Sequence, residues 1–254
     1  ENMTQDSLTV MHLGPDHPPI VKTVYGSVPN SIGGSPYIAM TRDGRYGFVP
    51  SSGRGQRGVP ETPNLLSVID LSAPDLAVVQ KLEVPLATNM LDLHSDGRLV
   101  VPVTTGFRVY EVQNGKLALV RENRGEIVPG SFDISPKGDR IIVTGRRGTT
   151  PDSPLGVHVF PYQDGVIEYA SEVKVQPGLP RFDRPFSLRF SPDGRRVLVP
   201  NGGGQGSKGT LDDVLVVDMT MSPPTVTEVI PQVADGIESL AFHPSGRFAV
   251  ISCL

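Results

Sequence analysis

The sequence predicts an all-β protein, and more specifically a β-propeller of four-stranded antiparallel blades. Three observations support this: many helix-breaking residues, a repeat of about 50 residues, and alternating apolar positions in each repeat. The 254-residue chain contains 28 glycines and 25 prolines, about a fifth of the total against a usual share of roughly 12%. Both residues disfavour long helices, and 38% of the chain is hydrophobic. We therefore expect a turn-dense, strand-rich globular protein.

A short motif recurs five times along the chain. Apolar residues lie six and four positions before a glycine, and turn-forming residues of the Ser-Pro-Asp-Gly type follow them. Alternating apolar residues indicate a strand, and the following residues favour a tight turn. The five copies occupy residues 38–44, 91–97, 132–138, 188–194 and 240–246.

Each turn leads into a second strand, and the first four copies then continue with two more strand-like runs. The second strands are predicted at 46–50, 99–103, 141–144, 197–200 and 248–252. The third and fourth strands are predicted at 65–71 and 78–84, 107–112 and 117–121, 156–160 and 166–173, and 214–218 and 225–230. Four strands in each repeat are typical of propeller blades.

The fifth copy stops after two strands, and the missing pair is predicted at the other end of the chain. Residues 7–13 resemble the third strand at 65–71, and residues 20–25 resemble a fourth strand. Joining the two half-blades would close a five-bladed ring without an open sheet edge. The alternative is a fragment of a seven-bladed propeller, which would need about two more repeats. In the five-bladed form, one domain spans 1–254, with blades at 31–86, 87–124, 125–176, 177–234, and 235–254 plus 1–30.

Charge and composition exclude several classes of function. The 23 basic and 27 acidic residues give a net charge of −4, which argues against a nucleic-acid partner because phosphate binding needs a basic face. The chain has no apolar run near the ~20 residues that span a bilayer. The single cysteine, Cys253, excludes an internal disulfide and a cysteine-based metal site. We expect no cofactor and no metal.

Two segments resemble a known family. Residues 191–201, Ser-Pro-Asp-Gly-Arg-Arg-Val-Leu-Val-Pro-Asn, are similar to the repeat unit of YVTN-repeat propellers, and residues 66–71 are similar to their Val-Ser-Val-Ile-Asp strand. This group includes lactonase-like propellers of the 6-phosphogluconolactonase and carboxymuconate-cyclase type, and non-enzymatic surface or periplasmic repeat proteins. The resemblance implies architecture more strongly than chemistry. None of the lactonases' catalytic residues is carried over. The resemblance also implies a periplasmic or secreted location, with the cytoplasm as the alternative.

Candidate site residues lie on the rim where loops enter each first strand. The position eight residues before each repeat glycine faces the central channel there, and it holds Asn89, Phe186 and Glu238 in three of the blades. Glu238 is the titratable member, and a carboxylate near the channel suits a general base. The alternative is a solvated loop glutamate.

The same rim is predicted to gather positive charge on long, uneven loops. Arginine side chains are suited to clamping a carboxylate or phosphate, so these cations predict an anionic small molecule or an acidic partner. The alternative is that they pair with loop aspartates. The cations are Arg54, Arg57, Arg146, Arg147, Arg181, Arg184 and Lys208.

Two functions follow as hypotheses. The first is a lactonase-like hydrolase or isomerase with Glu238 and Arg184 as catalytic residues. Its substrate-binding residues would be Asn89, Arg54, Arg146, Arg147, Arg181, Phe186 and Lys208. The second is a non-catalytic propeller that binds a protein, glycan or cell-surface partner through the long loops.

Overall fold

The computed structural model describes residues 7–15, 17–25, 37–51, 63–88, 90–148, 153, 155–202 and 209–253. In this part of the chain all regular secondary structure is β, and no helix is present. The all-β prediction is therefore confirmed. The chain forms two compact units, Glu1–Thr104 with Arg108–Glu122, and Thr105–Phe107 with Asn123–Leu254. Each unit has a hydrophobic core of its own.

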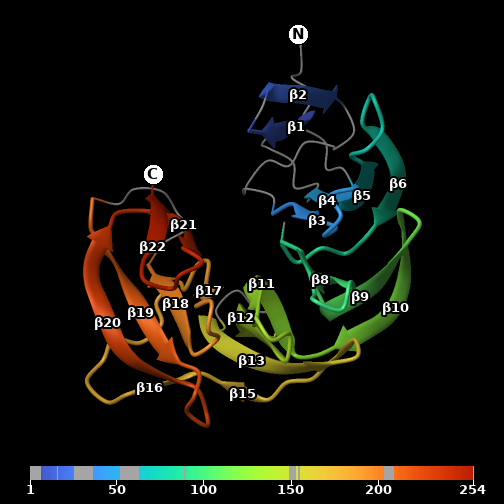
Figure 1. The fold of residues 1–254 in the computed structure, drawn as a ribbon. Helices are drawn as coiled ribbons and strands as arrows, with labels where there is room; N and C mark the ends of the chain where they lie inside the picture. The colour runs from blue at the N-terminus through green and yellow to red at the C-terminus, as the bar shows by residue number, and fades with distance from the viewer. Residues whose placement is uncertain are drawn as a thin grey trace. The chain divides into compact units, whose positions relative to one another are not determined.

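The first unit contains two four-stranded sheets and a hairpin (Figure 1). In both sheets, strands that follow one another in the chain are neighbours, as the repeat predicts. The hairpin is β1 (Ser7–Gly14) and β2 (His17–Tyr25). The sheets are β3 (Ala39–Met40), β4 (Tyr46–Ser51), β5 (Leu65–Asp70) and β6 (Ala77–Glu83), and β7 (Asp92–Leu93), β8 (Leu99–Val103), β9 (Gly106–Gln113) and β10 (Lys116–Arg124).

The second unit contains two larger sheets and a second hairpin. One sheet consists of β11 (Ile127–Ile134), β12 (Arg140–Arg147), β13 (Leu155–Gln163), β14 (Val166–Ile167) and β15 (Ser171–Glu172). The other consists of β16 (Lys174–Val175), β17 (Arg189–Phe190), β18 (Arg196–Asn201), β19 (Asp212–Asp218) and β20 (Thr225–Ala234). The hairpin is β21 (Ile237–Phe242) and β22 (Ala249–Cys253).

The repeated turns between first and second strands are stabilised by short side chains. The Thr41 hydroxyl donates to Asp43 at 2.6 Å and accepts from the backbone N–H of Tyr46 at 2.9 Å. Ser191 makes the same donation to Asp193 at 2.6 Å. These hydrogen bonds lower the pKa of Asp43 and of Asp193 below the ordinary value. The repeated motif therefore serves the fold, and the rim that carries these turns is structural.

The core of the second unit consists of residues that alternate along its central strands. Val197 and Val199 of β18, and Leu215 and Val217 of β19, are fully buried. They pack with apolar residues of β12 and β13, the middle strands of the other large sheet. Because side chains of a strand alternate between its faces, the period-two pattern places one apolar row of each strand between two sheets.

One predicted strand was wrong. The sequence predicted a continuous strand over residues 166–173, but the structure has the short strands β14 and β15, both paired with β13. The strand β16 that follows pairs in parallel with β20 of the other large sheet. The fourth strand of this repeat is thus divided between two neighbouring sheets.

Candidate functional site

The described residues include six of the nine proposed site residues, all of them in the second unit. These are Arg146, Arg147, Arg181, Arg184, Phe186 and Glu238. Arg54, Asn89 and Lys208 lie outside the described residues.

The segment that leads into β17, residues 181–187, is fixed by the buried side chain of Asn201 at the end of β18. The Asn201 carbonyl oxygen accepts from the backbone N–H of Asp183 at 2.7 Å, and its amide nitrogen donates to the carbonyl of Arg181 at 3.0 Å. Pro185 forms an isolated β-bridge with Asn201. This segment, which we call the rim loop, is therefore held in one conformation. Sequence reasoning missed the role of Asn201, although it ends the motif that carries the family resemblance.

Two residues of the rim loop have left-handed backbone conformations that are uncommon outside glycine. The φ angle is 50° at Arg184 and 59° at Ser187. Each such residue costs about 1–3 kcal/mol, and the surrounding structure must compensate for it. Here the Arg184 carbonyl accepts from Gly202 at 3.4 Å, and the Ser187 N–H donates to Ser131 at 3.1 Å. Backbone strain held in this way is concentrated at functional sites.

The rim loop carries two guanidinium groups and one carboxylate. Arg181 is exposed, and the Arg184 side chain is 39% exposed with its Nε 3.7 Å from Asp183 Oδ1. An exposed ion pair at this distance is weak, and an anion can compete for it. Phe186 is half-buried beside these charges in the sequence. The loop is thus a rigid, positively charged segment with two aromatic rings, those of Phe182 and Phe186.

Glu238 lies on β21 at an irregularity in its pairing with β22. The register shifts between Ile237 and Ser239, so that Glu238 is the additional residue. Such bulges redirect a side chain. Neither of the two cavities described below includes Glu238 or Arg184, so the joint action of these residues stays a prediction.

The neighbouring residues Arg146 and Arg147 make different contacts. Arg146 donates to the carbonyl of Ser153. The Arg147 guanidinium lies 5.1 Å from the centre of the Tyr169 ring and 3.8 Å from Glu126 Oε2. Arg147 and Tyr169 line a cavity of about 500 Å³, which we call the aromatic cavity. Tyr169 was missed because the sequence placed it inside a continuous strand.

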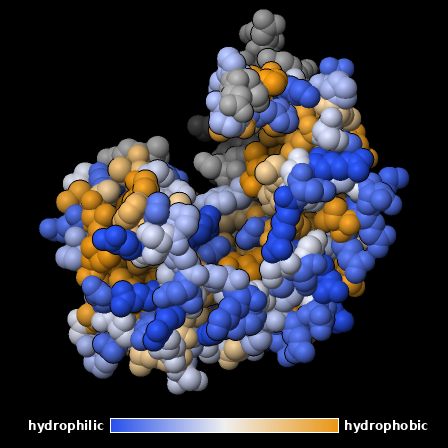
Figure 2. All heavy atoms as spheres, viewed as in Figure 1, coloured by the Kyte–Doolittle hydropathy of each residue, from blue (hydrophilic) through white to orange (hydrophobic). Residues whose placement is uncertain are grey.

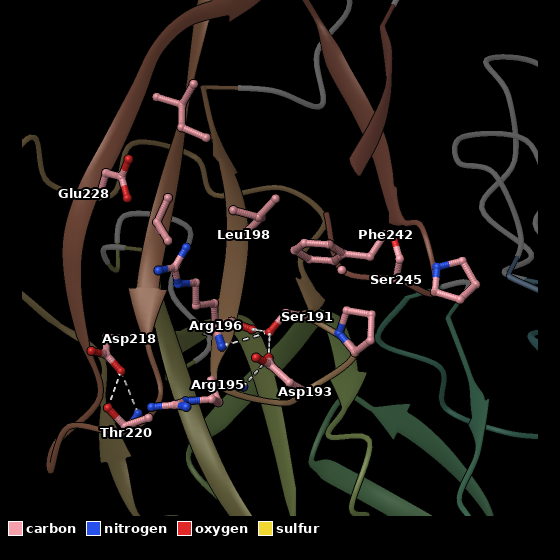
Figure 3. A pocket seen from close by; sticks show the side chains of 15 residues that line it. Ser191, Asp193, Arg195, Arg196, Leu198, Asp218, Thr220, Glu228, Phe242 and Ser245 are labelled. Atoms are coloured by element: carbon pink, nitrogen blue, oxygen red, sulfur yellow. Dashed lines mark hydrogen bonds between the residues drawn. The ribbon is translucent and has the colours of Figure 1, made fainter. Parts of the chain in front are cut away.

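A larger groove of about 820 Å³ lies beside the turn that precedes β18 (Figure 3). Two pairs of its polar side chains are hydrogen-bonded, Ser191 with Asp193 and Thr220 with Asp218. Its apolar part includes Leu198 of β18, and nearby apolar residues of β20 and β22 are exposed (Figure 2). This groove lies between the sheet that contains β18–β20 and the β21–β22 hairpin, which contributes Phe242.

His158 is buried on β13, behind Tyr169. It is 4% exposed. Its ring centre lies 6.0 Å from that of Tyr169. Burial lowers the pKa of His158. The charge of Glu172 and an interaction with the backbone of Gly145 partly oppose this shift, and the charge of Arg147 reinforces it. The folded protein therefore holds this histidine neutral.

We expect His158 to make stability fall in mild acid. The unfolded chain binds a proton near the ordinary histidine pKa of about 6.5, whereas the folded state resists it, so the free energy of unfolding falls below about pH 6.5. Urea unfolding of a His158→Phe variant should show a smaller loss between pH 7 and pH 5. The exposed-site variant His243→Gln is the control. Parallel losses in the wild type and in His158→Phe would contradict this assignment.

Comparison with known proteins supports the fold. No family model and no curated protein matches the chain. It is similar to a protein from Lactobacillus plantarum (16% identity, 100% of this chain, 72% of that chain, TM-score 0.66). It also resembles the β-propeller domain of Swd1 from Myceliophteria thermophila (13% identity, 87% of this chain, 62% of that chain, TM-score 0.57). A periplasmic gluconolactonase from Pseudomonas aeruginosa is similar as well (17% identity, 98% of this chain, 89% of that chain, TM-score 0.52). The structural neighbours thus include lactonase-like propellers, which confirms the predicted resemblance at the level of fold.

Among the described residues, no group of three or more His, Cys, Asp or Glu side chains is placed to hold a metal ion. Within the same part of the chain there is also no helix with the length and apolarity needed to cross a membrane.

Proposed function

We propose that the protein is a lactonase-like propeller that binds small anionic molecules at the rim loop and hydrolyses a lactone among them. The observation that carries this proposal is the fixed backbone of the rim loop, which bears Arg181 and Arg184. The buried Asn201 amide binds this backbone, and two of its residues have left-handed conformations. A charged loop that is already ordered loses little conformational entropy on binding. The likeness in fold to a gluconolactonase supports the choice of lactones.

The proposed reaction is the addition of water to the lactone carbonyl. Glu238 takes a proton from the water, the resulting hydroxide bonds to the carbonyl carbon, and Arg184 stabilises the negative charge on the carbonyl oxygen. Collapse of the resulting tetrahedral intermediate breaks the ring C–O bond, and the departing ring oxygen takes the proton from Glu238. The product is the open hydroxy acid, which leaves as its carboxylate.

Two variants test this assignment in an assay with anionic sugar lactones. We expect Glu238→Gln to lower kcat by roughly 100-fold or more, because it removes the base. Arg184→Ala should lower kcat/KM by about 100-fold through lost charge stabilisation. Arg195→Ala, an arginine in a structural turn, is the matched control and should leave turnover unchanged.

Unchanged turnover in both variants would reject these catalytic roles. If the anionic sugar lactones bind without being hydrolysed, and Arg184→Ala abolishes that binding, the protein is a non-catalytic binding propeller. That outcome would favour an acidic protein or glycan as the partner.

A periplasmic or secreted location is proposed together with the lactonase function, on the likeness to the periplasmic enzyme.

We further propose that the ring closes with five blades. In the second unit β22 pairs with β21, and its other edge has no strand partner among the described residues. In the first unit, Leu8 of the β1–β2 hairpin packs with Val49 and Ile69 of the first sheet, as the outer strands of a preceding blade would. An unpaired strand edge favours the addition of another strand. The hairpin supplies the third and fourth strands that β21 and β22 need.

A further inference from the structure

The aromatic cavity has walls that the chain holds in place. The Asn123 side chain donates to the carbonyl of Gly165 at 3.0 Å and accepts from the N–H of Ile167 at 3.0 Å. The N–H of Gly125 donates to the Thr105 carbonyl at 3.0 Å. At Gly106, where φ is 128°, a Cβ atom would overlap the carbonyl oxygen of Asn123. The backbone segments on this side of the cavity therefore approach closely and are fixed before any ligand binds.

Aromatic rings form another part of the cavity lining. Phe107 and Phe160 are buried, and their ring centres are 5.4 Å apart with an interplanar angle of 74°. Tyr169 meets Phe160 at 5.7 Å and 77°, and it is 42% exposed. Edge-to-face packing of this kind is favourable and directional. The cavity lining thus combines two buried aromatic rings with one that is partly exposed, which suits a flat apolar ligand.

Arg147 supplies a positive charge to the cavity lining, which also contains Arg124, Glu126 and Glu168. The Arg147 side chain is 57% exposed, and its neighbour Glu126 is 80% exposed at 3.8 Å. A pair this open to water is weak, so Glu126 can return to solvent at little cost. Tyr169 holds the guanidinium plane at 5.1 Å, and a guanidinium group binds a carboxylate through two parallel hydrogen bonds.

We propose that the aromatic cavity binds a small, flat aromatic carboxylate. The ring system would lie against Phe107, Phe160 and Tyr169, and its carboxylate would replace Glu126 on Arg147. A volume of about 500 Å³ lies within the range of small-molecule sites, about 300–1,000 Å³. This site includes Arg147, which the sequence placed among the substrate-binding residues, but it uses neither of the proposed catalytic residues, Arg184 and Glu238, so naphthoate binding tests it separately from lactone turnover.

The experiment uses 2-naphthoate as the probe and its fluorescence as the signal. The chain has no tryptophan, so the probe can be excited without indole emission. We expect saturable binding to the unmodified protein, and binding of the neutral naphthalene-2-carboxamide about tenfold weaker because the charged hydrogen bonds are lost. Arg147→Gln should weaken naphthoate binding about tenfold for the same reason. Tyr169→Leu should weaken it about fivefold through the lost ring contact.

Arg195→Gln, which removes a positive charge from a structural turn, should bind naphthoate like the wild type. The proposal is overturned if naphthoate does not saturate, if the carboxamide binds equally well, or if Arg195→Gln weakens binding as much as Arg147→Gln. The comparison of the two probes needs only the unmodified protein, so it can overturn the proposal even if a variant fails to fold.

Discussion

Replacement of Leu215 by alanine is expected to lower the free energy of unfolding by about 3–5 kcal/mol. Leu215 is fully buried on β19, an interior strand of its sheet, and it packs in the cluster that joins β12 and β13 to β18 and β19. Strands on either side are hydrogen-bonded to β19 and cannot move into the space easily. The alanine variant therefore loses the apolar contacts and leaves a cavity.

Urea unfolding followed by circular dichroism measures this effect. Leu211→Ala removes the same atoms from a leucine that is 53% exposed, and it should cost less than about 1 kcal/mol. The difference between the two variants isolates the contribution of packing between the sheets. A Leu215→Ala cost close to that of Leu211→Ala would show that the two sheets do not pack as described.

The second large effect concerns closure of the ring. In the first sheet Ser51, seven residues after its repeat glycine, pairs with Leu65. Cys253 lies seven residues after Gly246, and Ser7 is the N-terminal counterpart of Leu65. The proposed fifth blade therefore places Ser7 opposite Cys253, within the Cα separation of about 4.4–6.8 Å that a disulfide needs. A disulfide in the Ser7→Cys variant should raise the free energy of unfolding by about 5 kcal/mol, because it closes a loop of well over 100 residues.

Most of the fold could be predicted because it rests on local signals that repeat. Alternating apolar residues and the Thr41 or Ser191 type of turn recur in each unit, and the structure places strands on both sides of these turns. The prediction of one continuous strand at 166–173 was wrong. It rested on the local preference of apolar and aromatic residues for strands. Tyr169 instead packs on Phe160 and His158, contacts that depend on tertiary structure.

The candidate site could be predicted in composition but not in arrangement. Charge on long loops identified Arg147 and Arg184 as residues of interest. Sequence spacing gives no direction for a guanidinium group, and the structure turns Arg147 onto Tyr169. Sequence spacing also does not reveal that Asn201, at the end of β18, fixes the rim loop through two hydrogen bonds.

The closed five-bladed ring is tested most directly by mapping disulfides in the oxidised Ser7→Cys variant by mass spectrometry of its peptides. Thr9→Cys is the matched control, since its new thiol would lie two residues along the same strand and out of reach of Cys253. Closure predicts an intramolecular bond between position 7 and Cys253 that forms in nearly all molecules, and none in the Thr9→Cys variant. Free thiols in the Ser7→Cys variant, or bonds only between molecules, would contradict closure and would mean that the N-terminal hairpin completes a different blade.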